Sequence, residues 1–194
     1  MLRLARRLPL LLGLALLAVL AQAQQSGYFQ SYPGGTTHAV YQISDAKLSN
    51  PIKLGFDVKP AAGDQLTVIT TNEVTASRDE LSGGVFEGMA AAQLAVSNPA
   101  VQALAGQQLQ VGTTYVLPGG ARFSAQESKK IAGAPVIAGF LTDPQKPGQR
   151  TRLALAQGEA ALTLPFPPLI ETETLTDGSY RTTFKLELVE FSRQ

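Results

Sequence analysis

Residues 79–106 read DELSGGVFEGMAAAQLAVSNPAVQALAG, and they lack the alternation that marks β-strands elsewhere in the chain. Apolar side chains recur in this stretch at helical spacing, at Leu81, Val85, Met89 and Ala92. A second helix is predicted to begin at Asn98-Pro99, because asparagine caps helix ends and proline needs no N–H partner in the first turn. Gly106 is its predicted stop, since glycine adopts the left-handed conformation that ends helices. The sequence therefore predicts a helical insert at about residues 79–106.

Short alternating runs flank this insert. The clearest is Ile52–Lys59, in which four apolar side chains share one face: Ile52, Leu54, Phe56 and Val58. A period of two over eight residues is typical of a half-buried antiparallel strand. Asp177-Gly178 separates two further runs, and this dipeptide favours the type I′ turn of a β-hairpin. The alternation slips near Val189 and Phe191, which predicts a bulge or the strand end.

Turn residues divide the remaining sequence into similar segments. Strands are predicted at 37–43, 65–75, 113–117, 135–142 and 150–157. The segment 135–142 is nearly all apolar, which predicts a strand covered on both faces. The segment 162–169 contains three prolines, so it is predicted to be an extended edge or crossing segment. Together these features predict an α+β, β-rich fold: a curved antiparallel sheet, half-barrel in its extreme form, with one or two short central helices packed on one face.

The N-terminus has the pattern of a cleavable signal peptide at residues 1–23. Three arginines precede an apolar run from Leu8 to Leu20, and Ala21-Gln22-Ala23 follows as a small-x-small cleavage site. A membrane span needs about 20 apolar residues, so a permanent anchor is disfavoured. We expect export to the periplasm or the extracellular space, with residues 24–194 forming a single β-rich domain.

Composition excludes several classes of chemistry. The chain has no cysteine, which excludes disulfides, thiolate catalysis and a lipid-modified cysteine anchor. Without residues 1–23, 13 basic residues face 15 acidic ones, and no basic cluster is longer than Lys129-Lys130. Nothing in this balance attracts nucleic acid or an anionic membrane surface.

Catalytic and metal sites find little support in the sequence. His38 is the single histidine, so a serine triad would have to combine it with residues such as Ser31 and Asp45. No G-x-S-x-G motif accompanies it, and one histidine without cysteine disfavours zinc. Glu171 and Glu173 share a strand face as a glycosidase pair might, although charges on a solvent-facing strand also discourage edge pairing. We expect no catalytic residue, no metal site and no cofactor.

The insert itself suggests a binding function. Its helix is rich in alanine and glycine, so it must either lie very close to the sheet or leave room beneath it. If room remains, an apolar small molecule would be held by Leu54, Phe56, Val85, Phe86, Met89 and Leu94. Exported carriers of lipids or lipoproteins have a similar layout of sheet and central helices, although no shared motif places the chain in a family.

Three functions follow in order of preference. The first is an exported, non-catalytic binding protein of the cell envelope that holds an apolar or lipid-like ligand between sheet and helices. The second is a structural or protein-interaction envelope protein with a filled core and no ligand. The third is a hydrolase that uses carboxylates. The expected partners are an apolar small molecule or an envelope protein, with no nucleic acid and no stable membrane anchor after signal cleavage; the sequence does not set the oligomeric state.

Overall fold

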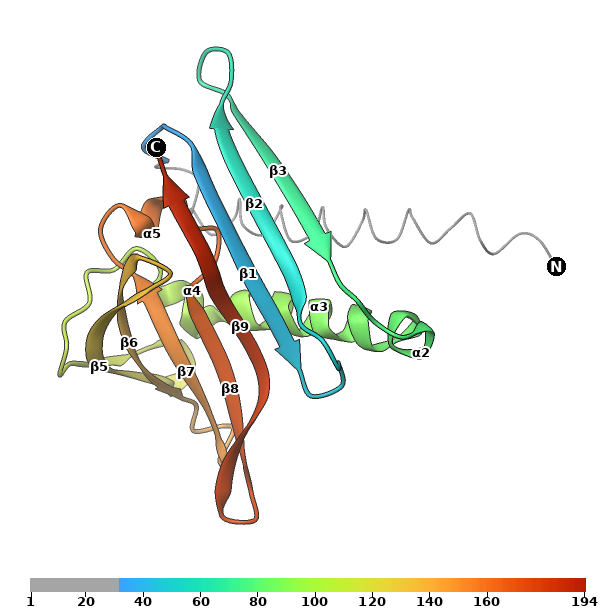
Figure 1. Cartoon of the computed structure of the whole chain (residues 1–194). Coiled ribbons are helices and arrows are strands. Elements are labelled where there is room, and N and C mark those ends of the chain that lie inside the picture. The colour runs from blue at the N-terminus through green and yellow to red at the C-terminus, as the bar shows by residue number, and fades with distance from the viewer. Residues whose placement is uncertain (1–31) are drawn as a thin grey trace.

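The alternating segments build one antiparallel sheet of nine strands in the computed structural model, which describes residues 32–194. The strands follow the order β3-β2-β1-β9-β8-β7-β6-β5-β4, and each pairs antiparallel with its neighbours (Figure 1). Their bounds are β1 Thr37–Asp45, β2 Ile52–Pro60, β3 Leu66–Glu73, β4 Thr114–Val116, β5 Arg122–Ile131, β6 Ala134–Thr142, β7 Gln149–Ala156, β8 Leu169–Thr176 and β9 Ser179–Arg193.

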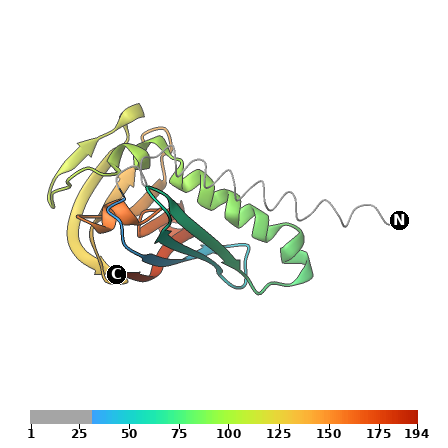
Figure 2. The same cartoon turned by 90° about the horizontal axis from the view of Figure 1, so that it is seen from above.

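The sheet is strongly curved and open, with β3 and β4 as its free edges. Figure 2 shows the strands curling around the helices, so that the helices lie on the inner, concave side. The curvature is sharpest where β5 carries a bulge between Ala125 and Glu127. Gly139 on β6 faces this place, where a Cβ atom would stand 2.0 Å from the Ser124 carbonyl oxygen. The predicted fold class, a curved antiparallel sheet with short helices on one face, is confirmed.

Three helices occupy the central segment where one or two were expected: α2 Arg78–Ser82, α3 Gly84–Val96 and α4 Pro99–Leu104. Gly83 separates α2 from α3, because its backbone (φ −147°, ψ −61°) is not helical. α4 begins as predicted: the Asn98 side chain accepts a hydrogen bond from the Ala100 N–H, and Pro99 stands in the first turn. Gly106, at φ +74°, takes the left-handed conformation expected after the last helix.

The main apolar core fills the space between the concave face and the helices. Alternate residues of each strand enter it, including Tyr41 of β1, Phe56 of β2 and Leu153 of β7. β6 is buried on both faces as predicted, because Val136 and Ala138 join a second apolar cluster with Ala154 and Leu169. Of the two alternatives for 162–169, an edge strand or a crossing segment, the crossing segment is the one found. The short helix α5, Ala160–Thr163, ends within it, and residues 164–168 are buried and irregular.

The C-terminal hairpin has the predicted turn. Asp177 and Gly178 have φ of +52° and +76°, which is the type I′ signature. The slip in the alternation of β9 is a bulge, since Glu190 and Leu188 face the adjacent residues Val40 and Tyr41 of β1. Within residues 32–194, the remaining helical element is a single 3₁₀ turn, η1 Pro118–Gly120.

The predicted signal peptide, residues 1–23, lies outside the described residues. Within residues 32–194, no helix combines the length and the apolar character that a membrane crossing requires.

Candidate functional site

An apolar groove lies between helix α3 and the concave face of strands β1, β2, β3 and β9. The sheet contributes apolar walls from three strands: Ile43, Leu54, Phe56 and Leu186. Helix α3 and the crossing segment supply the other apolar walls: Met89, Ala92, Val96 and Phe166. Three polar side chains complete the lining: Thr70, Asn72 and Gln93.

The groove is narrow and open at one side. About 510 Å³ of space lies between its walls when the open mouth is included, and only about 30 Å³ is deep enough to hold a water-sized sphere. A cavity of that volume has room for about one water molecule. Met89, which is half-buried, fills part of the space, and its unbranched side chain can adopt several rotamers at little cost. An apolar chain would therefore enter by displacing a flexible side chain rather than by opening the core.

The first turns of α3 are fixed against the β1–β2 connection. A Cβ atom at Gly84 or Gly88 would lie 3.2 Å or 3.1 Å from the Leu48 side chain, so these glycines let the helix approach closely. Lys47 and Glu87 form an ion pair across the same contact. Because the close contact is confined to the start of the helix, the groove opens beside its later turns, at Met89, Ala92 and Val96.

Glu80 binds α2 to the same connection. Its carboxylate accepts hydrogen bonds from the Ser49 hydroxyl and from the backbone N–H groups of Ser49 and Ser77, and the Ser77 side chain accepts from the Glu80 N–H in return. This reciprocal pair is a capping box. The hydrogen bond from the Ser49 side chain is the main cause that lowers the pKa of Glu80 to about 2, and the backbone N–H of Ser77 adds to it.

Phe166 forms a buried part of the groove wall. The Tyr41 hydroxyl donates a 2.8 Å hydrogen bond to the Phe166 carbonyl oxygen and so fixes the crossing segment over the sheet. The rings of Tyr41, Phe56 and Phe166 pack edge to face, with centroids 5.2–6.2 Å apart. This arrangement is favourable for aromatic quadrupoles and gives the groove a rigid wall.

Three of the six predicted ligand residues line the groove: Leu54, Phe56 and Met89. The other three lie elsewhere on α3. Val85 is buried in the core in the first turn, where the helix touches the β1–β2 connection, and Phe86 is 38% exposed. Leu94 is 72% exposed because it lies five residues from Met89, about 140° around the helix. The prediction took apolar residues from the insert without fixing which side of the helix faces the sheet, and only part of α3, at Met89, Ala92, Gln93 and Val96, lines the groove.

Sequence reasoning missed the residues that come from outside the insert and β2. Ile43 and Leu186 could have been found from strand alternation once the strand order was known. Phe166 carries a weak signal of its own, since it is an aromatic residue among prolines in LPFPP. Such a segment cannot join a ladder, so its aromatic side chain has to be buried in another way.

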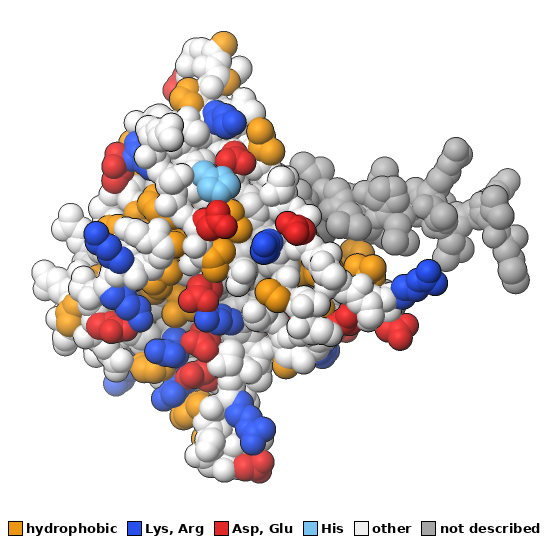
Figure 3. Space-filling view, viewed as in Figure 1, with side chains coloured by type: hydrophobic (Ala, Val, Ile, Leu, Met, Phe, Trp, Pro, Cys, Tyr) orange, Lys and Arg blue, Asp and Glu red, His pale blue; other side chains and the backbone are white. Residues whose placement is uncertain are grey.

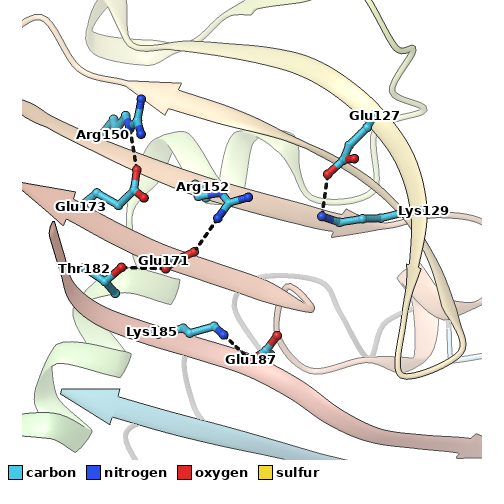
Figure 4. A network of polar contacts seen from close by, with 9 residues as sticks. All are labelled: Glu127, Lys129, Arg150, Arg152, Glu171, Glu173, Thr182, Lys185 and Glu187. Atoms are coloured by element: carbon cyan, nitrogen blue, oxygen red, sulfur yellow. Dashed lines mark hydrogen bonds and ion pairs between the residues drawn. The ribbon is translucent and has the colours of Figure 1, made fainter. Parts of the chain in front are cut away.

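The opposite, convex face carries ion pairs between neighbouring strands. Figure 3 shows acidic and basic side chains in alternation on this face, and Figure 4 shows the pairs that they form. Arg150 pairs with Glu173 at 2.5 Å and Arg152 with Glu171 at 3.4 Å. Arg150 also lies between the rings of Phe140 and Tyr180, at 4.5 Å and 3.9 Å from their centroids.

This network corrects the sequence interpretation of Glu171 and Glu173. Their side chains are only 13% and 12% exposed, so they do not lie on an open solvent-facing surface. Each carboxylate is held by an arginine of β7, and Glu171 also accepts a hydrogen bond from the Thr182 hydroxyl. Pairing across three adjacent strands fits a structural role in the sheet better than a glycosidase pair.

His38 lies on the same convex face as part of a small polar cluster. Its Nδ1 is 2.8 Å from Asp57 Oδ1, and its Nε2 is 3.7 Å from Glu190 Oε2. Both ring nitrogens of His38 thus face carboxylates. Asp45, the acid considered for a triad, instead accepts a hydrogen bond from the Lys47 N–H, and Ser31 lies outside the described residues. Across residues 32–194, no group of three or more His, Asp or Glu side chains is placed to hold a metal ion.

Comparison with known proteins gives no family. No family model matches the chain. No curated protein matches it either. Among solved structures, a chain of the MucA/MucB complex from Pseudomonas aeruginosa is 10% identical at a TM-score of 0.41, and the alignment covers 89% of this chain and 56% of that chain. A crystal structure of MucB is 9% identical at a TM-score of 0.39, with 89% and 58% covered.

A domain of a putative outer membrane lipoprotein-sorting protein from Vibrio parahaemolyticus is 12% identical at a TM-score of 0.25, with 92% of each chain covered. The chain spans a little over half the length of the MucB chains. Likenesses this distant assign no activity, ligand or partner to this protein.

Proposed function

We propose that this protein is an exported, non-catalytic binding protein of the cell envelope that holds an apolar, lipid-like ligand between helix α3 and the sheet. The observation that carries the proposal is the groove, whose walls are apolar apart from three polar residues at one side. Binding sites for small apolar molecules are concave, mostly apolar clefts with a few placed polar groups. The export part of the proposal rests on the signal-peptide pattern of residues 1–23.

A fluorescent acyl probe titrated into protein lacking residues 1–23 tests the proposal. We expect saturable binding by the parent and weakened binding by Met89→Trp, because an indole would fill the groove where Met89 now lies. Leu94→Trp is the matched control, since it places the same side chain on the exposed side of the same helix. It should bind the probe as the parent does.

Circular dichroism of both variants checks that they fold. No saturable binding by the parent, or equal loss in both tryptophan variants, would contradict the proposal.

A second candidate is the structural or protein-interaction envelope protein, and two exposed apolar features favour it. Edge strand β3 has no partner on its outer side, and Leu66, Val68 and Ile69 are 37–45% exposed. Phe86 and Leu94 are exposed on α3. Exposed apolar residues on a long, unprotected edge mark surfaces that pair with another chain. A parent that binds no acyl probe but associates through β3, as judged by loss of association in Val68→Lys, would favour this function.

A further inference from the structure

The groove changes from polar to apolar across the sheet. Two of its three polar residues, Thr70 and Asn72, belong to the edge strand β3, and the third, Gln93, belongs to α3. Asn72 is exposed and Thr70 is half-buried. Its apolar side lies deeper in the sheet, where Ile43 of β1 and Leu186 of β9 are both about 2% exposed or less. A molecule that enters from the β3 edge therefore meets hydrogen-bonding groups first and an apolar wall last.

None of the eleven described lining residues is charged. A carboxylate or phosphate that leaves water needs a cation or several strong donors to offset its desolvation. Asparagine, glutamine and threonine supply both donors and acceptors, which match an ester, an amide or a hydroxyl group. The chemistry of the mouth thus fits an uncharged polar head and disfavours an ionised one.

One buried aromatic residue is shared with a second pocket. Phe166 lines the groove and also lines a shallow pocket whose space is about 260 Å³ when its open mouth is included. The other walls of that pocket are Ala105, Gly106, Leu155, Ala156, Ala161, Leu164, Pro167 and Pro168. Phe166 is only 6% exposed, and it is the one residue that the two linings share.

We propose, as a refinement that rests on the function proposed above, that the groove binds an uncharged single-chain amphiphile with its head at Thr70, Asn72 and Gln93 and its tail ending at Phe166. The ligand class is a neutral acyl ester or amide. Phe166 is then the residue that sets the length of the tail.

Competition at pH 8 tests the head. Protein without residues 1–23 is loaded with the uncharged probe N-phenyl-1-naphthylamine, which is then displaced by dodecanoyl glycerol, dodecanoate or dodecyl phosphate, each below its micelle concentration. The glycerol ester should displace the probe at a concentration at least about tenfold lower than either anion, because the anions lose hydration that the mouth does not replace. Asn72→Leu should remove this preference.

Thr71→Leu is the matched control for Asn72→Leu, because Thr71 is the next residue of β3 and points to the other face. It should keep the preference for the ester. Equal displacement by ester and anions in the parent would overturn the assignment of the head.

A series of glycerol esters from octanoyl to octadecanoyl tests the tail. Phe166→Ala should join the two pockets and move the optimum to longer chains, and Phe166→Leu should move it in the same direction if the alanine variant fails to fold. Leu164→Ala is the control, since Leu164 lines only the second pocket. If a folded Phe166 variant prefers the same ester chain length as the parent, Phe166 does not set the length of the tail.

The two levels of the proposal fail differently. If the parent does not bind the probe at all, the apolar-binding function and this refinement are both overturned. If the probe binds, but its displacement depends neither on the charge of the competitor's head nor on the length of its tail, only the refinement is overturned.

Discussion

The Phe56 side chain belongs to the alternating pattern of β2, to the apolar core and to the wall of the groove. It is 3% exposed, packs edge to face against Tyr41 and Phe166, and lines the deep part of the groove. Phe56→Ala should therefore lower the free energy of unfolding by about 3–5 kcal/mol, through lost burial and the cavity that remains. Urea unfolding followed by circular dichroism measures the change.

Lys53 is the control for this substitution, because it is an exposed residue on the other face of β2. Lys53→Ala should change the free energy of unfolding by no more than about 0.5 kcal/mol. Equal destabilisation by the two variants would contradict the assignment of faces on β2.

Alternation placed Leu54 and Phe56 correctly because the chain itself fixes which residues of a strand share a face. It could not place Phe166 or Leu186 beside them. Those contacts depend on the pairing of β9 with β1 and on where the crossing segment passes, and neither is encoded in a local period. The predicted residues therefore include the groove wall formed by β2 and Met89, and they leave out the lining residues that come from distant parts of the chain.

At the scale of elements, the hairpin β8–β9 depends on Gly178. Its φ of +76° costs glycine little, whereas a β-branched residue there meets Cβ clashes worth about 1–2 kcal/mol. Gly178→Val should lower the free energy of unfolding by that amount. A Cβ atom at Gly178 would have no other atom within 4 Å, so packing does not confuse the measurement.

Asparagine tolerates the left-handed region better than valine, which makes Gly178→Asn the matched control. It should be closer to the parent in thermal unfolding. A valine variant as stable as the parent would contradict the type I′ turn.

The contact between α2 and the β1–β2 connection should weaken in acid. The pKa of Glu80 is lowered from 4.5 to about 2, chiefly by the hydrogen bond from Ser49, so folding favours its ionised form. A lowered carboxyl pKa stabilises the folded state at pH values above the ordinary pKa, and this stabilisation is lost as the pH falls from about 4.5 through about 2. NMR titration of the Glu80 carboxyl carbon should give its midpoint near the lower value.

Ser49→Ala removes the main cause of this shift and should raise the Glu80 midpoint toward 4.5. Hydrogen exchange of the α2 amides should then become faster at a higher pH than in the parent. A Glu80 midpoint near 4.5 in the unsubstituted protein would show that the carboxylate is not held as described.

Local signals predicted the existence of most elements and misjudged some boundaries. Asn98-Pro99 and Asp177-Gly178 were sufficient because capping and type I′ turns are decided by one or two residues. The break at Gly83, between α2 and α3, was not predicted. The hydrogen bond between Ser49 and Glu80 could not be predicted either, because the two residues are 31 positions apart in the sequence.

At the scale of the whole molecule, export is the part of the proposal that the described residues do not test. The leader combines three arginines, an apolar run and a small-x-small site, so the exported protein should begin at Gln24. N-terminal sequencing of protein recovered from outside the cytoplasm measures this directly. An N-terminus that retains Met1 in that fraction would contradict cleavage.

Curvature was predicted only in outline, because it arises from features that act through several strands. The bulge in β5 and the close approach of Gly139 to Ser124 bend the sheet where β5 pairs with β6. In the sequence, Gly139 is one of the eight residues of the run 135–142, and nothing there marks it as the place where the sheet bends. The main core nevertheless continues from Phe56 on β2 to Leu153 on β7 without interruption.

This continuous core predicts that residues 24–194 unfold as one cooperative unit. Phe56→Ala removes core volume on β2, next to an edge strand, and Leu153→Ala removes it on β7, four strands away, where Leu153 is fully buried. Each truncation should cost about 2–5 kcal/mol. In a single domain, both should shift one urea transition to a lower midpoint and leave its slope unchanged, since the slope follows the surface exposed on unfolding.

Two independent units would behave differently: the parent would show two transitions, and each substitution would move only one of them. The double variant adds a sharper check, because distant sites in one cooperative unit destabilise additively to within about 0.5 kcal/mol. A double variant whose midpoint equals that of the weaker single variant would contradict a single domain, since each unit would then unfold without regard to the other.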